Sequence, residues 1–292
     1  MSPREHSIPR VLSIAGTDPT GGAGIHADLK SIAANGGYGM AVVTALVAQN
    51  TTEVRTIHTP PPSFLAEQLA AVSDDVTIDA VKIGMLATAD NAAVLGAWLA
   101  ETTPPIVVLD PVLKASTGDA LGRDDLLQAL RDLLPLCGVV TPNLDELAAL
   151  ADEPPASSWD AAIAQAQRLS EAYEVAVLVT GGHLGGATSP DAVIDPRDTL
   201  GTGRAVSPLM APRVATANTH GTGCSLSAGL ATNRARSGDW LEALRVTKTW
   251  LTGALASADR LDVGRGPGPL DHFHHLWPEG EGSAAAEPDP VA

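Results

Sequence analysis

The sequence predicts an α/β fold in which a mostly parallel sheet is covered by helices on both faces. Short aliphatic or β-branched segments alternate with longer amphipathic segments along most of the chain. No linker-like break interrupts this alternation. The pattern is typical of repeated strand–helix–strand units, whose crossover helices cover both sides of a sheet.

Six apolar segments are predicted to be strands, because each is rich in aliphatic residues and ends at turn-forming residues. After Gly182, turn residues and short apolar segments as far as Val214 indicate hairpin-like strands at an edge of the sheet. The six predicted strands are residues 11–15, 40–48, 80–83, 106–109, 138–141 and 175–179.

Helices are expected between these strands, and two long helices over residues 222–236 and 240–261 are expected to complete the domain. Three earlier helices have recognisable N-terminal capping residues. These are Ser63 with Glu67 after it, Thr88 before residues 89–100, and Ser157 or Ser158 before residues 159–170.

The chain of 292 residues is predicted to form one domain with a short extension at each end. Residues 1–9 are an N-terminal extension and residues 10–277 are the folded domain. Residues 278–292 are poor in large apolar side chains and are expected to be a disordered tail.

The composition limits the kinds of binding partner and the cellular compartment that we expect for this chain. A formal net charge of -16 argues against a nucleic-acid partner, because an acidic surface repels phosphate. Cys137 and Cys224 lie in different contexts, so no disulfide is expected and a reducing, cytoplasmic setting fits best. No signal-peptide pattern is found, and no apolar run approaches the roughly 20 residues that span a bilayer. We therefore expect no membrane association.

Two glycine-rich turns each precede an amphipathic segment. One covers residues 16–24 and the other residues 218–224. Glycines allow close approach of the backbone to a ligand, and helix N-termini attract anions. The turns therefore predict a site that holds a phosphate-bearing ligand, which indicates phosphoryl transfer.

Polar residues and glycines also follow each of the six predicted strands. Ligands in open α/β sheets bind outside the carboxyl ends of the strands, so these loops are expected to meet at one site. Any one of them could instead be an ordinary turn, because turns require the same residue types.

The ordered set of these motifs resembles the ribokinase-like superfamily. Within it, the set is most similar to the hydroxymethylpyrimidine and phosphomethylpyrimidine kinases of thiamine synthesis. The resemblance covers about residues 10–277 and implies a three-layer αβα sandwich. The matching segments are residues 11–30, 44–51, 82–86, 110–112, 141–146, 181–184, 218–224 and 263–274.

The resemblance implies a role for each matching residue, with ATP and magnesium (Mg2+) as cofactors and a monovalent cation left open. Cys224 would accept the proton of the substrate hydroxyl, and the amides of Gly221, Thr222 and Gly223 would stabilise the transferred phosphoryl group. The pyrimidine site would be lined by Gly16, Asp28, Gln49, Met85 and Val112. The nucleotide site would contain Lys82, Asp110, Asn143, Thr180, Gly182, His183 and Lys248, with Glu146 and Asp110 at the metal.

Position 180 departs from the family pattern, in which a lysine often precedes the Gly-Gly-His segment. Thr180 provides no charge there, so Lys82 and Lys248 are the candidates to compensate. A thiol at a helix N-terminus is expected to have a lowered pKa, which favours Cys224 as the base.

Simpler interpretations remain open at several positions. Asn143 and Glu146 have the spacing of a helix capping box. Cys224 could be a buried apolar residue, or a nucleophile with His220. His183 could be only a turn residue, and the histidines His272, His274 and His275 are expected to pack rather than bind metal.

The predicted function is phosphorylation of 4-amino-5-hydroxymethyl-2-methylpyrimidine and then of its monophosphate. A pyridoxal or pyridoxine kinase is the nearest alternative, and a non-catalytic pyrimidine sensor is a third. Family resemblance also implies a homodimer.

Overall fold

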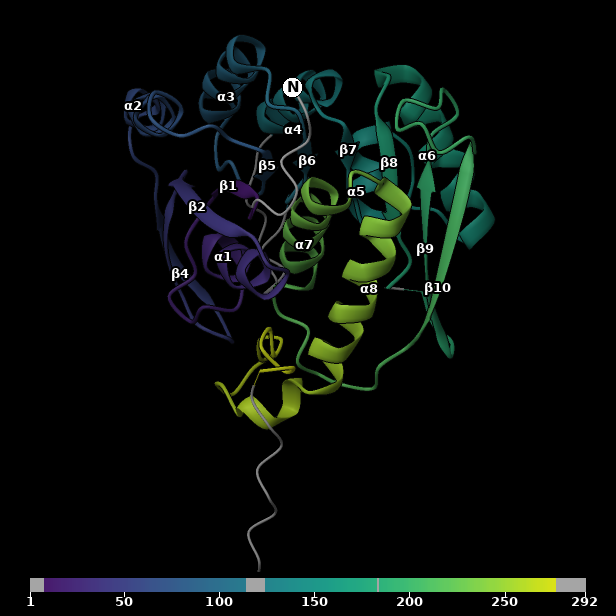
Figure 1. The fold of residues 1–292 in the computed structure, drawn as a ribbon. Helices are drawn as coiled ribbons and strands as arrows, with labels where there is room; N and C mark the ends of the chain where they lie inside the picture. The colour runs from purple at the N-terminus through teal and green to yellow at the C-terminus, as the bar shows by residue number, and fades with distance from the viewer. Residues whose placement is uncertain (1–7, 114–123, 183, 277–292) are drawn as a thin grey trace, which may run out of the picture.

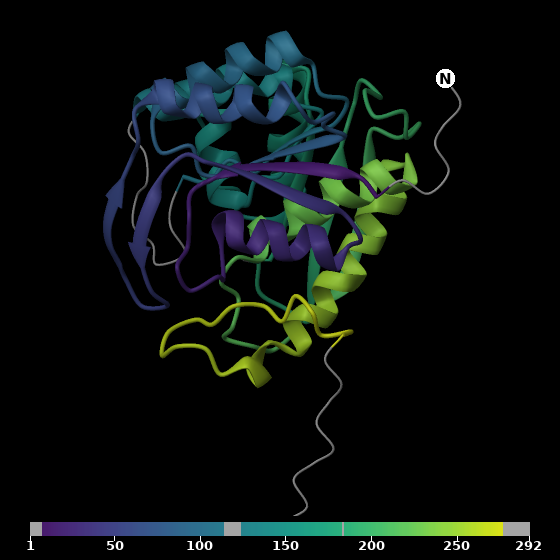
Figure 2. The same cartoon turned by 60° about the vertical axis from the view of Figure 1, so that its left-hand side comes forward.

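The computed structural model describes residues 8–113, 124–182 and 184–276. The predicted tail and His183 lie outside these residues. The described part is a central eight-stranded sheet between two layers of helices, as Figures 1 and 2 show. The predicted three-layer α/β architecture is therefore confirmed.

Six neighbouring strands of the sheet are parallel, and the last two continue it as an antiparallel edge. This edge confirms the hairpin expected after Gly182. In spatial order the strands are β10 (Val206–Pro212), β9 (Thr188–Ile194), β8 (Ala176–Thr180), β7 (Val139–Val140), β6 (Val107–Leu109), β5 (Ala80–Ile83), β1 (Arg10–Ala15) and β2 (Tyr38–Val43).

Each face of the sheet has its own apolar core. One face is covered by α1 (Gly24–Ala34), α7 (Thr222–Ser237) and α8 (Trp240–Ala256). The other is covered by α2 (Pro62–Ser73), α3 (Ala89–Thr102), α4 (Asp124–Leu133), α5 (Leu144–Ala151) and α6 (Trp159–Tyr173), with short 3-10 helices η1 (Leu134–Leu136) and η2 (Ala258–Leu261) elsewhere.

The single strand expected over residues 40–48 is divided into two strands, because the chain leaves the sheet at Thr44. The Thr44 amide donates to the carbonyl of Ala15, and its hydroxyl donates to that of Met85 at 2.6 Å. Beyond this crossing, β3 (Leu46–Gln49) and β4 (Val54–His58) form a separate antiparallel pair. This pair projects from the sheet edge beside β2, on the left of Figure 2.

The capping predictions were partly correct. Thr88 and Ser158 cap α3 and α6 by accepting backbone N–H groups. The cap predicted at Ser63 is wrong, because α2 begins at Pro62, whose fixed φ suits a first helical turn. The last long helix, α8, ends at Ala256 rather than at residue 261. Within the described residues, no helix is both long and apolar enough to cross a bilayer.

Candidate active site

The N-terminus of α7 lies under the carboxyl ends of the central parallel strands. α7 packs against β1, β5 and β6, so its first turn faces the loops that follow these strands. Gly221 is the N-cap, with a left-handed φ of 81°. A Cβ atom at this position would lie 1.8 Å from the carbonyl oxygen of Gly22, so only glycine fits there. The two glycine-rich turns predicted from the sequence are thus in direct backbone contact.

One backbone amide in the first turn of α7, that of Thr222, is not free to bind a phosphoryl group as expected. The Thr222 amide donates to the carbonyl of Thr219 at 3.2 Å, and its hydroxyl donates to the same oxygen at 2.7 Å. Thr222 therefore shapes the turn. Gly223 is exposed and Cys224 is half-buried, so these two positions are accessible from solvent.

The Cys224 thiol lies between the start of α1 and the end of β6. The Gly24 amide donates to the sulfur, and the thiol in turn donates to the carboxylate of Asp110. Burial raises the pKa of the Cys224 thiol to about 12. The charge of Lys82 opposes this rise, and the carboxylates of Asp110 and Asp28 add to it. The expected fall in this pKa is therefore wrong, because burial outweighs the groups that lower the pKa, which are Lys82 and the Gly24 amide.

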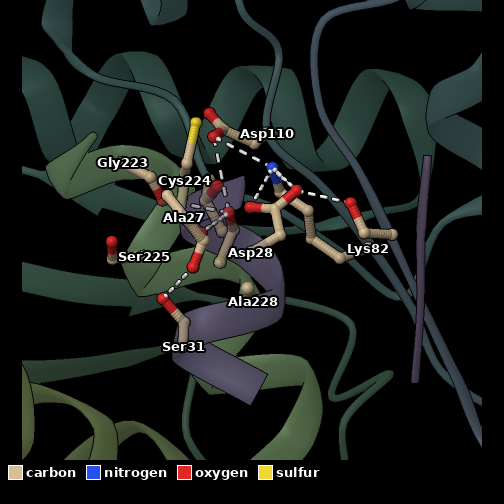
Figure 3. Close-up of polar contacts among 12 residues, drawn as sticks. Ala27, Asp28, Ser31, Lys82, Asp110, Gly223, Cys224, Ser225 and Ala228 are labelled. Atoms are coloured by element: carbon tan, nitrogen blue, oxygen red, sulfur yellow. Dashed lines mark hydrogen bonds and ion pairs between the residues drawn. The ribbon is translucent and has the colours of Figure 1, made fainter. Parts of the chain in front are cut away.

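A buried ion cluster lies beside Cys224, as Figure 3 shows. The Lys82 ammonium on β5 is 2.9 Å from Asp28 on α1 and 3.9 Å from Asp110. Burial would lower the pKa of Lys82, but these carboxylates hold it above its usual range. The Ser13 hydroxyl donates to Asp28 at 2.6 Å.

The placement of Lys82 and Asp28 corrects two sequence-based assignments. Neither side chain has exposed surface. Lys82 is therefore an internal counter-ion instead of a cation that contacts nucleotide phosphate. Asp28 holds Lys82 instead of lining the pyrimidine site.

The buried carboxylate of Asp110 and the half-buried carboxylate of Glu146 form a pair that fits a hydrated magnesium ion. Burial first, and then repulsion from Asp110, raise the pKa of Glu146 to about 8. A divalent cation would relieve this repulsion. No group of three or more His, Cys, Asp or Glu could hold a metal in the described part of the chain. Magnesium bound here would therefore keep water or phosphate as its remaining ligands.

The alternative role of Asn143 and Glu146 as a capping box is confirmed. The Asn143 side chain accepts the amides of Asp145 and Glu146 at 3.0 Å, and Glu146 accepts the Asn143 amide at 3.0 Å. One carboxylate oxygen of Glu146 is thus used for capping. The capping role and a metal role are compatible, because a carboxylate has two oxygens.

Two of the residues predicted for the pyrimidine site are in contact. A Cβ atom at Gly16 would lie 2.3 Å from the terminal methyl carbon of Met85, so a larger residue would displace this methionine. Gln49 ends β3 and is half-buried, and Val112 follows Asp110 after β6 and is also half-buried. Their roles toward a pyrimidine stay predictions.

The nucleotide-side residues Thr180 and Lys248 lie at the carboxyl end of β8. Thr180 pairs with Asp191 across β8 and β9, and the Lys248 ammonium forms an ion pair with Asp191. Lys248 therefore brings a cation close to the position where Thr180 provides none. Gly182 is exposed, and the Arg213 guanidinium, which we did not predict, donates to the Gly182 carbonyl at 2.7 Å.

Sequence reasoning also missed a buried pair that joins the two glycine turns. The His220 Nε2 atom lies 2.7 Å from a carboxylate oxygen of Asp18. With this nitrogen engaged by Asp18, His220 is oriented toward the first turn and not as a base for Cys224, which removes the support for the nucleophile interpretation. The only local signal for this pair was the position of each residue inside a glycine-rich segment.

This architecture is that of a class of α/β kinases that act on small molecules. It is similar to the solved structure of Bacillus subtilis pyridoxal kinase, with a TM-score of 0.80 and 30% identity over 92% of this chain and 99% of that one. Residues 18–271 match the phosphomethylpyrimidine kinase family. The chain belongs to this family.

Two relatives show how the chain compares in length. It is 48% identical to the hydroxymethylpyrimidine/phosphomethylpyrimidine kinase of Salmonella typhimurium, over 91% of this chain and 98% of the relative. It is 55% identical to the thiamine biosynthesis multifunctional protein ThiED of Corynebacterium glutamicum, over 92% of this chain. The chain spans only 34% of that larger protein.

Proposed function

We propose that this chain transfers the γ-phosphoryl group of ATP to the hydroxymethyl oxygen of 4-amino-5-hydroxymethyl-2-methylpyrimidine, and then phosphorylates the monophosphate to the diphosphate. The observation that carries the proposal is the meeting of two helix N-termini at Cys224, at the carboxyl ends of the sheet. Family membership and the names of the relatives support the choice of substrate. The pyridoxal kinase of Bacillus subtilis, which was solved as an ADP complex, supports the choice of nucleotide.

In this proposal the protein acts mainly by positioning and electrostatics. The amides of Gly223 and Cys224 stabilise negative charge on the transferred group. Cys224 takes the hydroxyl proton in its thiolate form, which the Gly24 amide stabilises, and so returns to the thiol. In the thiol form the S–H group donates to Asp110, which orients the sulfur. Lys82 offsets the negative charge of Asp28 and Asp110.

Asp110 and Glu146 would hold magnesium, which supplies charge neutralisation of the nucleotide phosphates. Asn143, Thr180, Gly182 and Lys248 would face the nucleotide. A homodimer, a cytoplasmic location and dependence on a monovalent cation are further proposals that rest on family resemblance.

A coupled ATP assay with the aminopyrimidine, its monophosphate and pyridoxal tests the substrate. We expect kcat/KM for the aminopyrimidine to exceed that for pyridoxal by at least about tenfold, which is roughly 1.4 kcal/mol of transition-state stabilisation. Equal or faster turnover of pyridoxal would identify a pyridoxal kinase instead. Binding without turnover would identify a sensor.

Gln49→Ala is expected to reduce this discrimination by about tenfold, because one amide hydrogen-bonding group toward the ring is removed. The KM for ATP should stay nearly constant in the same assay. A change confined to the KM for ATP would place Gln49 on the nucleotide side.

Glu146→Gln is expected to raise the magnesium concentration for half-maximal rate by about tenfold and to lower kcat, since a charged ligand becomes neutral. The amide oxygen can still accept the Asn143 amide, so the melting temperature should change little. In the unmodified chain, magnesium competes with a proton on Glu146, whose pKa is about 8. The magnesium requirement should therefore fall as pH rises from 6 toward 8, about tenfold per pH unit at most. If the magnesium requirement and its pH dependence were the same in Glu146→Gln as in the unmodified chain, the only role of Glu146 would be to cap α5.

A further inference from the structure

The Asp18 carboxylate is a buried hydrogen-bonding centre in the first glycine turn. It has no exposed surface. One oxygen accepts the amide of Thr20 at 2.9 Å and its hydroxyl at 2.8 Å. The other accepts the amides of Gly22 at 3.1 Å and Ala23 at 2.8 Å. Asp18 therefore fixes the backbone that leads into α1.

His220 holds the second glycine turn to the same carboxylate. Its ring is 6% exposed, and Nε2 lies 2.7 Å from the Asp18 oxygen that also accepts Gly22 and Ala23. The His220 backbone is fixed independently, because its amide donates to the carbonyl of Gly268 at 3.1 Å. The ring thus spans a fixed distance between two backbone segments that are each held by hydrogen bonds and are 202 residues apart in the chain.

The two ends of this connection lead directly to the reacting thiol. On one side, the turn that Asp18 organises ends at Gly24, whose amide donates to the Cys224 sulfur. On the other side, His220 is followed by Gly221, which contacts the Gly22 carbonyl so closely that no Cβ fits. A shift between the turns would therefore separate the Gly24 amide from the sulfur.

We propose that Asp18 and His220 are a positioning pair that sets the spacing between the N-termini of α1 and α7, and so aligns the Gly24, Gly223 and Cys224 amides on one reaction centre. This inference rests on the proposed phosphoryl transfer. Neither side chain touches the reacting atoms. Their effect is on geometry, to which catalysis is sensitive at the level of about 1 Å.

The protonation of Asp18 agrees with this role. Burial alone would raise the pKa of its carboxyl group, but the hydrogen bonds from His220 and Thr20 outweigh burial and lower it to about 2. The carboxylate is therefore ionised at every working pH. It accepts short, charge-assisted hydrogen bonds, which are the strong kind.

Two amide substitutions of His220 distinguish the loss of the contact with Asp18 from the loss of the imidazole ring itself. The side-chain nitrogen of His220→Gln can take the place of Nε2, whereas His220→Asn is one methylene shorter and does not reach Asp18. We expect kcat to fall at least about 30-fold in His220→Asn with less than about threefold change in either KM, and to recover to within about fivefold in His220→Gln. His274→Asn is the matched control, because it makes the same change at a histidine that packs against Gly253 on α8. This substitution should lower only the melting temperature.

Amide hydrogen exchange provides a readout that does not require turnover. Peptides covering residues 20–26 and 218–226 should exchange faster in His220→Asn than in His220→Gln, and should be unchanged in His274→Asn. Wild-type kcat or unchanged exchange in His220→Asn would overturn the proposal, as would equal loss in the asparagine and glutamine variants. If the unmodified chain failed to phosphorylate the aminopyrimidine, the proposed function would fail, while the exchange comparison would still test the pair.

Discussion

Cys224→Ser is expected to lower kcat by at least about 100-fold while the KM values and the melting temperature change little. The serine hydroxyl has nearly the size of the thiol and can keep the hydrogen bonds to Gly24 and Asp110. A hydroxyl ionises far less readily than a thiol, so proton removal from the substrate becomes the limiting step. Steady-state kinetics with saturating ATP and aminopyrimidine measure this directly.

The pH dependence of the unmodified enzyme gives a second check on Cys224. Because the pKa of the thiol is raised to about 12, the thiolate fraction is small at neutral pH and increases about tenfold for each unit of rising pH. We expect kcat to rise with pH from 7 to 10 without a plateau from this group. A near-normal kcat in the serine variant would falsify the base assignment and leave the glycine-turn amides as the main catalytic feature.

The parts of this fold that the sequence predicted are those specified by local patterns. The glycine turns, the caps at Thr88 and Ser158 and the antiparallel edge all depend on residues close together in the chain. A helix cap or a strand period has the same physical cause in any tertiary context, so these predictions required no knowledge of the neighbouring elements.

The errors concern residues whose partners are remote in sequence. Lys82 was expected at the nucleotide, but its partner Asp28 is 54 residues away and becomes adjacent only when α1 packs on the sheet. The break at Thr44 likewise depends on Met85, which is 41 residues away. The sign of the Cys224 pKa shift was missed for the same reason, because the pKa is raised first by burial under other elements and then by the carboxylates of Asp110 and Asp28 on those elements.

Lys82→Met is expected to destabilise the fold at pH 7.5 by about 3–5 kcal/mol, the usual cost of removing one partner from a buried ion pair. Methionine fills a similar volume, so the loss comes from charge. Asp28 has no exposed surface and would lose the ammonium 2.9 Å away, and Asp110 would lose the same partner at 3.9 Å. Chemical denaturation of the full chain measures the change in unfolding free energy.

Two comparisons attribute this loss to the uncompensated carboxylates. Without Lys82, the folded-state pKa of Asp28 rises further above its unfolded value of about 3.9, so the variant loses stability as pH rises and regains it in acid. The deficit should therefore shrink between pH 7.5 and 5. Adding Asp28→Asn should restore part of the stability at pH 7.5, because the amide oxygen can still accept from Ser13 without carrying charge.

Lys30→Met is the matched control for the loss of a lysine. Lys30 is on α1, and its ammonium donates to the carbonyl of Gly21 at 2.8 Å, which is a neutral acceptor. Its loss should cost about 1.5–3 kcal/mol, as for a hydrogen bond of a charged group. The loss should change less with pH between 5 and 7.5 than in Lys82→Met, because Lys30 acts only on the nearby charges of Asp18 and His272. An equal, pH-independent loss in Lys82→Met and Lys30→Met would show that Lys82 contributes packing alone. The charge balance beside Cys224 would then have to come from protonation of Asp28 or Asp110, in place of the ammonium on β5.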